Sequence, residues 1–271
     1  MTWTEHTVVR EGVRLSCRDR GGPGVPIVLL HGLAGHAGEW DALAAHLGDR
    51  DRHRLVAVDQ RGHGASERRP GDVSRAAYVA DVVAVVEQLG LHRPVLVGQS
   101  LGGHTAMLTA AAHPDLTGGL VLVEAGPGRD DPGRPAEIAQ ALGAWPTPFP
   151  SRAAAVDFFG GGTVGESWAD GLEERDGGWW PRFDPDVMAE ALAENARRSF
   201  WDEWTGLTCP TLAVFGQAGI IPAEETDAML ERRPETVAAS VPAAGHDVHL
   251  EHPEALGRLL REYVTGLGRH R

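Results

Sequence analysis

Residues 94–112 read Pro-Val-Leu-Val-Gly-Gln-Ser-Leu-Gly-Gly-His-Thr-Ala-Met-Leu-Thr-Ala-Ala-Ala. An apolar run is followed by a glycine-flanked serine, Ser100, and then by an alanine-rich segment. This order predicts a strand, a sharp turn and a helix, because glycines have no Cβ atom to obstruct the turn. Such a turn lifts the serine hydroxyl out of the sheet. It also directs the amide of Leu101, at the positive end of the helix, toward a developing oxyanion.

Short apolar runs alternate with helical segments along most of the chain. The predicted strands are His6–Val9, Leu15–Arg18, Ile27–Leu30, Leu55–Val58, Val95–Val97, Leu120–Val123, Leu212–Phe215 and Ala238–Val241. The predicted helices are Trp40–Leu47, Tyr78–Leu89, Leu101–Ala112, Ala223–Arg232 and Pro253–Leu267. Runs that are apolar throughout are typical of strands buried on both faces. The alternation therefore predicts an α/β fold, with a mostly parallel eight-stranded sheet and helices on both faces.

The alternation stops between Gly126 and Gly206, where Gly, Pro and Trp are frequent. Helical patterns occur here at 136–142, 152–159 and 186–200. We therefore predict a core of residues 1–126 and 206–271, with an inserted helical cap at 127–205. The tryptophans of this segment either pack the cap or form an aromatic wall over a binding cleft. The candidates for contact with a substrate are Trp145, Trp168, Trp179 and Trp180.

Charge and cysteine content exclude several classes of function. The formal net charge is −13 and all 25 basic residues are arginine, which argues against a nucleic-acid partner. Cys17 and Cys209 are far apart in the sequence and form neither a disulfide pattern nor a metal-ligand pattern. No leader or membrane-length apolar segment is found. We expect a cytoplasmic protein without membrane partner, metal or cofactor; its oligomeric state has no signal in the sequence.

Four motifs in this order resemble those of the α/β-hydrolase family over nearly the whole chain. They are His31-Gly32-Leu33, the segment 59–66 (Asp-Gln-Arg-Gly-His-Gly-Ala-Ser), the pentapeptide around Ser100, and Gly245-His246 after the last strand. The resemblance implies that Ser100 is a nucleophile. A free hydroxyl is a poor nucleophile at neutral pH and needs a base, and His246 is the base that the resemblance implies.

The first two motifs are expected to shape the site. In the family, the loop at His31-Gly32 places the amide of Leu33 beside that of Leu101, so that both donate to an oxyanion. His31 and Gly32 are thus expected to border the substrate, with His31 orienting the loop. Asp59 and His63 look like loop-bracing residues of the second motif.

The acid of the triad departs from the usual family pattern. Most relatives carry an Asp after the seventh strand, but the segment 212–222 contains no carboxylate. Glu124 closes an apolar strand, where an ionised side chain is costly unless it is paired. Zearalenone lactonases and a subgroup of haloalkane dehalogenases place a Glu after the sixth strand, and the separation of Ser100 from Glu124 is similar. Glu224 and Glu225 remain alternatives.

A serine nucleophile implies attack on a carbonyl carbon, because family members that open bonds at saturated carbon use Asp at this position. The predicted function is hydrolysis of a carboxylic ester or lactone through a Ser-His-Glu triad and an acyl-enzyme. Alternatives with the same triad are C–C bond hydrolysis, thioester cleavage and acyl transfer. A ligand-binding protein without turnover is the alternative of another class. The tryptophans favour an apolar or aromatic acyl substrate, and the acidic charge disfavours a highly anionic one.

Overall fold

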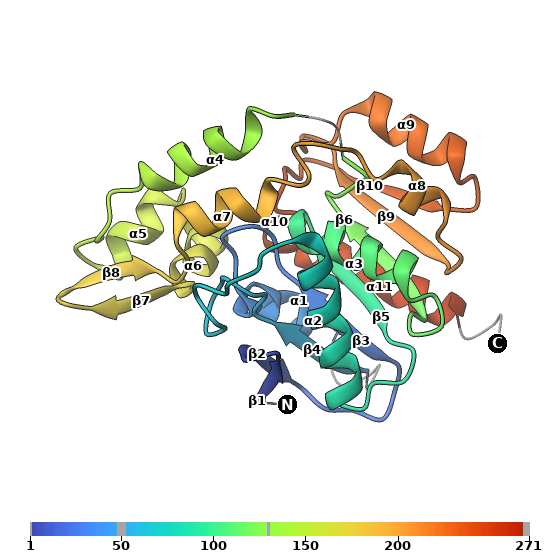
Figure 1. The fold of residues 1–271 in the computed structure, drawn as a ribbon, viewed down its shortest axis with the longest axis horizontal. Helices are drawn as coiled ribbons and strands as arrows, with labels where there is room; N and C mark the ends of the chain where they lie inside the picture. Colours follow the sequence, from blue (N-terminus) through green and yellow to red (C-terminus); the bar gives the residue numbers. More distant parts are fainter. Residues whose placement is uncertain (1, 48–52, 129–130, 268–271) are drawn as a thin grey trace.

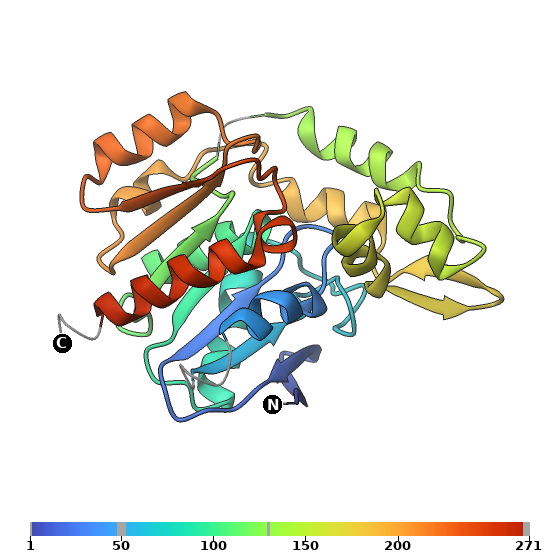
Figure 2. The same ribbon diagram turned by 180° about the vertical axis from the view of Figure 1, so that it is seen from behind.

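The computed structural model describes residues 2–47, 53–128 and 131–267 and is built on an eight-stranded sheet (Figures 1 and 2). Its strands are β1 Thr4–Arg10, β2 Val13–Asp19, β3 Pro26–Leu30, β4 Arg54–Val58, β5 Val95–Gln99, β6 Gly119–Val123, β9 Thr211–Gly216 and β10 Val237–Val241. The strand order is β1-β2-β4-β3-β5-β6-β9-β10. Strands β1, β2 and β4 pair antiparallel, and the pairs from β4 to β10 are parallel. The predicted α/β fold with a mostly parallel eight-stranded sheet is confirmed.

Helices cover both faces of this sheet. They are η1 Ala37–Trp40, α1 Asp41–Leu47, α2 Arg75–Gln88, α3 Leu101–Ala112, α8 Trp201–Thr205, α9 Ala223–Arg232, α10 Val248–Glu251 and α11 Pro253–Leu267. Alternate side chains of β3 enter opposite cores, because successive residues of a strand face opposite sides. Ile27 and Leu29 pack with α1 and α11, whereas Val28 and Leu30 pack with α2, α3 and α8.

The stretch 134–192, which lies between β6 and β9, gathers at one end of the molecule (Figure 1). It contains α4 Arg134–Gly143, α5 Arg152–Phe158, α6 Gly162–Asp170, β7 Leu172–Arg175, β8 Gly178–Pro181 and α7 Pro185–Leu192. His36, in the loop after β3, makes a hydrogen bond from Nε2 to the carbonyl oxygen of Ser167 in α6 at 2.9 Å. This bond ties the segment to the loops at the carboxyl ends of the strands. Its assignment as a separate cap at 127–205 stays a prediction.

One local prediction in this segment is wrong, and one pair of strands was not predicted. The helix expected at 186–200 ends at Leu192, because Phe200 leaves the helical path to donate its amide to Pro127 and to pack edge-on against His104, with ring centroids 4.4 Å apart. The β7–β8 hairpin was not predicted. Asp176 and Gly177 both have positive φ, the conformation that Asp-Gly favours in a tight hairpin turn, so the signal was present.

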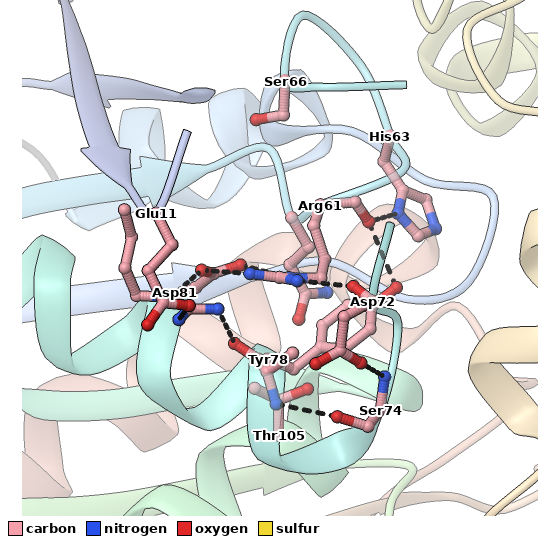
Figure 3. A network of polar contacts seen from close by, with 12 residues as sticks. Glu11, Arg61, His63, Ser66, Asp72, Ser74, Tyr78, Asp81 and Thr105 are labelled. Carbon is pink, nitrogen blue, oxygen red and sulfur yellow. Dashed lines mark hydrogen bonds and ion pairs between the residues drawn. The ribbon is translucent and has the colours of Figure 1, made fainter. Parts of the chain in front are cut away.

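A buried ion pair holds the 59–66 loop (Figure 3). The guanidinium of Arg61 is 1% exposed and donates to both carboxylate oxygens of Asp81 at 2.6 Å. Arg10 donates to the same carboxylate at 2.9 Å, and the hydroxyl of Tyr78 donates to the carbonyl of Arg61 at 3.1 Å. Bidentate pairing fixes both partners in orientation. Helix α2, which carries Asp81, thereby anchors the loop after β4.

Replacement of Asp81 by Asn should lower the free energy of unfolding by about 3–5 kcal/mol, because it leaves a buried guanidinium without its charged partner. Urea denaturation measures the change. The matched control is Glu254→Gln, which removes an exposed ion pair with Arg258 on α11 and should cost less than about 1 kcal/mol. Equal small losses in the two variants would show that the Arg61 pair does not anchor the loop.

Candidate active site

Ser100 occupies the turn between β5 and α3. Its φ of 50° and ψ of −117° form a strained conformation that non-glycine residues rarely adopt. The neighbouring glycines permit it by close backbone contact. A Cβ atom at Gly98 would lie 2.2 Å from the carbonyl oxygen of Gly102, and one at Gly102 would lie 2.2 Å from the carbonyl oxygen of Leu30. Residues 98 and 102 must therefore be glycine for β5, α3 and β3 to meet at this point.

Glu124 follows the last residue of β6 and is 1% exposed. Its Oε1 accepts a hydrogen bond from the amide of Gly216 at 2.7 Å, and its Oε2 accepts one from the amide of Ile220 at 2.8 Å. Both amides belong to β9 and the loop that follows it. Two such bonds offset much of the cost of burying a carboxylate.

His246 lies in the loop after β10, and its Nδ1 is 3.4 Å from Oε2 of Glu124. The loop after β9 contacts the same carboxylate, and this contact explains why the usual acid position in that loop carries no carboxylate. A Cβ atom at Gly219 would lie 2.1 Å from Oε1 of Glu124, so any larger residue there would displace that carboxylate. The acid after β6 and the glycine after β9 therefore require each other.

The two alternative acids differ in their surroundings, although Glu225 lines the same cavity as Glu124. Glu224 is exposed at the start of α9. Glu225 is buried beside it, and its Oε1 accepts from the amide of Gly128 at 3.2 Å. The geometry thus brings Glu124, rather than either of these residues, to His246.

Two residues that the sequence did not single out hold the loop of His246. Gln99 donates from Nε2 to the carbonyl oxygen of His246 at 3.1 Å. Glu251 accepts from the amides of Gly245 and Asp247 at 2.7 and 3.1 Å, one on each side of the histidine. A polar residue at the buried end of β5 was the available signal for Gln99. No signal in the sequence pointed to Glu251, because its contacts with the amides of Gly245 and Asp247 depend on the turn into α10.

The predicted oxyanion donors, Leu33 and Leu101, line the same cavity as Ser100. Leu101 is the first residue of α3, so its amide has no acceptor within the helix. His31 is fully buried below the Leu33 loop: its Nε2 accepts from the amide of Gln60 at 3.0 Å, and its Nδ1 contacts the carbonyl oxygen of Gly32 at 2.7 Å. Burial lowers the pKa of His31 to about 3, which keeps it neutral. His31 therefore braces the loop instead of bordering the substrate.

The cavity at this site has a volume of about 620 Å³ and lies between the strand ends and the segment from β6 to β9. Its described lining includes Gly32, Leu33, Glu39, Gln99, Ser100, Leu101, His104, Glu124, Ala125, Gly126, Gly128, Asp131, Arg134, Ile138, Trp168, Leu192, Asn195, Ile220, Ile221, Pro222, Glu225, His246 and Asp247. Ser100, His246 and Glu124 thus share one cavity with both predicted oxyanion donors. Among the described residues, no group of three or more His, Cys, Asp or Glu could hold a metal ion.

Of the four tryptophans predicted to contact a substrate, Trp168 lines the cavity. Its Nε1 donates to Oδ2 of Asp247 at 3.1 Å, which links α6 to the loop of His246. The other three have different surroundings. Trp145 packs against the rings of Phe158, Phe159, Trp168 and Phe183.

Trp179 and Trp180 lie on β8, away from the described cavity lining. Trp179 pairs through its backbone with Phe149, and the guanidinium of Arg175 stands over the ring of Trp180. Trp179 also packs against the apolar cluster of Phe149, Ala155 and Leu172, so neither tryptophan of β8 belongs to the described lining of the cavity.

A second buried acid–histidine pair adjoins the cavity. Glu39 is 2% exposed, and its Oε2 is 3.2 Å from Nε2 of His249. Burial raises the pKa of Glu39 to about 8 and lowers the pKa of His249 to about 4. Both groups are therefore neutral at neutral pH. A neutral Glu39 adds no negative charge near the oxyanion loop, whose Gly35 it contacts.

A strained serine between a strand and a helix, a buried carboxylate beside a partly exposed histidine, and two backbone amides at one cavity define the arrangement of an α/β-hydrolase site. The family model described as "Alpha/beta hydrolase family" matches residues 27–259. The chain belongs to the alpha/beta hydrolase family. In the part of the chain that is described, no helix has both the length and the apolar character needed to cross a membrane.

Several known proteins are similar to this chain. The 2-(acetamidomethylene)succinate hydrolase of Mesorhizobium japonicum is 26% identical over 261 residues, which are 93% of this chain and 92% of that protein. The sn-1-specific diacylglycerol lipase ABHD11 of Mus musculus is 43% identical over 107 residues, and these span 40% of this chain and only 34% of the lipase. The crystal structure of E-2-(acetamidomethylene)succinate hydrolase has the same fold, with a TM-score of 0.88 at 24% identity, covering 97% of this chain and 99% of that one.

The contacts of Glu124 lead to a first prediction for the site. Glu124→Gln should lower kcat by about three to four orders of magnitude with a small change in KM, because an amide does not stabilise the imidazolium of His246. Kinetics on an activated ester measure this, with thermal unfolding as a check on folding. The matched control is Glu224→Gln, which should keep full activity. Comparable losses in both variants would refute the assignment of Glu124.

Glu39 gives a second prediction, on stability. Because the folded pKa of Glu39 is raised above its ordinary value of 4.5, the contribution of this residue to stability should fall as pH rises from about 4.5 to about 8, since Glu39 ionises first in the unfolded chain. Glu39→Gln removes this ionisation. The variant should therefore gain stability relative to wild type across that window and level off above pH 8. Urea denaturation at pH 5, 7 and 9 measures the difference, and a pH-independent difference would contradict the raised pKa.

Proposed function

We propose that this protein is a serine hydrolase that cleaves a carboxylic ester or a lactone through an acyl-enzyme intermediate. The main support is the convergence of Ser100, His246 and Glu124 on one cavity, with Nδ1 of the histidine 3.4 Å from a doubly hydrogen-bonded carboxylate. A serine in this role attacks carbonyl carbon. Two of the similar proteins described above, a hydrolase and a lipase, agree with this class of chemistry.

In the first half of the cycle, Oγ of Ser100 would add to the carbonyl carbon while Nε2 of His246 takes the hydroxyl proton. Glu124 would hold the imidazole in one tautomer through Nδ1 and stabilise it once it is charged. The amides of Leu33 and Leu101 would donate to the oxyanion. Collapse of this intermediate breaks the bond to the alcohol oxygen, which leaves with the proton from His246.

In the second half, water would attack the acyl-enzyme carbonyl and give its proton to His246. Collapse would then release the acid and return the proton to Ser100. For a lactone, the alcohol and the acid remain in one product, a hydroxy acid. The same residues thus serve both substrate types.

The substrate that we propose is small and largely apolar. Leu33, Ile138, Leu192, Ile220 and Ile221 supply apolar surface to the cavity, and Trp168 adds an aromatic ring. Acidic side chains, such as Asp131 and Asp247, outnumber the basic ones in the described lining. Such a cavity favours a neutral acyl group over a highly anionic one.

A fluorophosphonate probe should label wild-type protein at Ser100 and should not label Ser100→Ala. The same variant should lose about four to six orders of magnitude in kcat, because the nucleophile is removed while the cavity remains. The assay is a panel of p-nitrophenyl esters, aliphatic and aromatic lactones, acyl thioesters and vinylogous diketones. Turnover of esters or lactones supports the proposal. Turnover of only thioesters or diketones, or ligand binding without labelling, would overturn it.

A further inference from the structure

His104 lies one helical turn beyond the nucleophile, and its amide donates to the carbonyl oxygen of Ser100 at 2.9 Å. The side chain is 4% exposed and lines the same cavity as Ser100. Neither of its ring nitrogens has a hydrogen-bond partner. Buried polar atoms are nearly always paired, so two unpaired nitrogens beside a substrate cavity point to a missing ligand group.

The surroundings of His104 determine what it can bind. Burial, with Arg75 and Arg198 nearby, lowers the pKa of His104 well below its ordinary value. The ring is therefore a neutral imidazole, with one nitrogen that donates and one that accepts. Phe200 covers it edge-on, with ring centroids 4.4 Å apart, so it is held in a fixed orientation.

Asn195 contributes a complementary group to the lining of the same cavity. It follows α7 in the segment between β6 and β9, and its side-chain oxygen is buried without a hydrogen-bond partner. An amide oxygen accepts a hydrogen bond. The cavity thus presents a free donor on His104 and a free acceptor on Asn195.

We propose that His104 and Asn195 form a polar subsite that binds a hydroxyl group of the substrate. A hydroxyl is able to accept from the imidazole N–H and donate to the amide oxygen at once, whereas a carboxylate or a ketone has no proton to give to Asn195. This subsite deepens the proposed function and rests on it. It makes a hydroxylated ester, rather than a purely hydrocarbon one, the preferred substrate.

The helix sets the spacing between the subsite and the reacting carbonyl. Four residues separate Ser100 from His104, which corresponds to about 6 Å along the axis of α3. An extended chain spans that distance in about five bonds between the carbonyl carbon and the hydroxyl oxygen. The matching esters carry a hydroxyl on the fifth or sixth carbon of the acyl chain, or on the third or fourth carbon of the alcohol chain.

The test compares methyl 6-hydroxyhexanoate with methyl 6-methoxyhexanoate and methyl hexanoate, and 4-hydroxybutyl acetate with butyl acetate, by titration of released acid. In at least one of the two series, wild type should prefer the hydroxylated ester by about tenfold in kcat/KM, as expected for buried hydrogen-bonding groups that would otherwise stay unpaired. His104→Phe and Asn195→Leu should each bring the ratio of kcat/KM for the hydroxylated ester to that for the unsubstituted ester down to about one, whatever the change in either rate alone.

The matched control is His113→Phe, an exposed histidine at the end of the same helix, which should retain the wild-type preference. Asn195→Leu provides an independent test if His104→Phe does not fold, as judged by thermal unfolding. No hydroxyl preference in either series, or a preference unchanged in both subsite variants, would overturn the subsite. Turnover of the unsubstituted esters by wild type, with labelling of Ser100, would leave the hydrolase proposal intact in that case.

Discussion

The carboxylate of Glu124 is the interaction on which the geometry of the site depends. It lies at the end of β6, accepts two amides from β9 and its loop, and contacts the histidine of the loop after β10. A buried negative charge is costly unless it is surrounded by donors. Three consecutive elements of the sheet edge are therefore held in register by one side chain, and the tautomer of His246 follows from that register.

Close backbone packing imposes the second constraint. Gly98, Gly102 and Gly219 each stand where a Cβ atom would lie 2.1–2.2 Å from another atom, and these contacts join the elbow to β3 and make room for Glu124. The strain at Ser100 is sustained by a sheet whose central strands are buried on both faces. A rigid core thus supports a reactive residue in a conformation that an isolated turn would not keep.

The segment between β6 and β9 shows where sequence patterns fail to predict the structure. The strand and helix alternation of the core was predictable because each apolar run has a single way to be buried in a parallel sheet. The tryptophans of this segment were compatible with two roles, packing or contact with a substrate. Of the four candidates, Trp168 lines the described cavity and Trp145, Trp179 and Trp180 do not. The helix expected through residue 200 was cut short at Leu192 because Phe200 finds its partners in α3 and beside β6. Long-range contacts of this kind leave no periodic trace in the chain.

By itself, the sequence determined the succession of strands and helices along the chain and the sharp turn at Ser100. It also determined the order of the motifs, which places a histidine after the last strand. These features depend on local propensity and on glycine at defined spacings. Only the tertiary structure decided which acid meets His246, that Gln99 and Glu251 hold its loop, and that His104 and Asn195 face one cavity. The reason is physical. Such contacts join residues that are from 4 to more than 140 positions apart in the sequence. These residues come into contact only when the sheet has packed against the segment between β6 and β9.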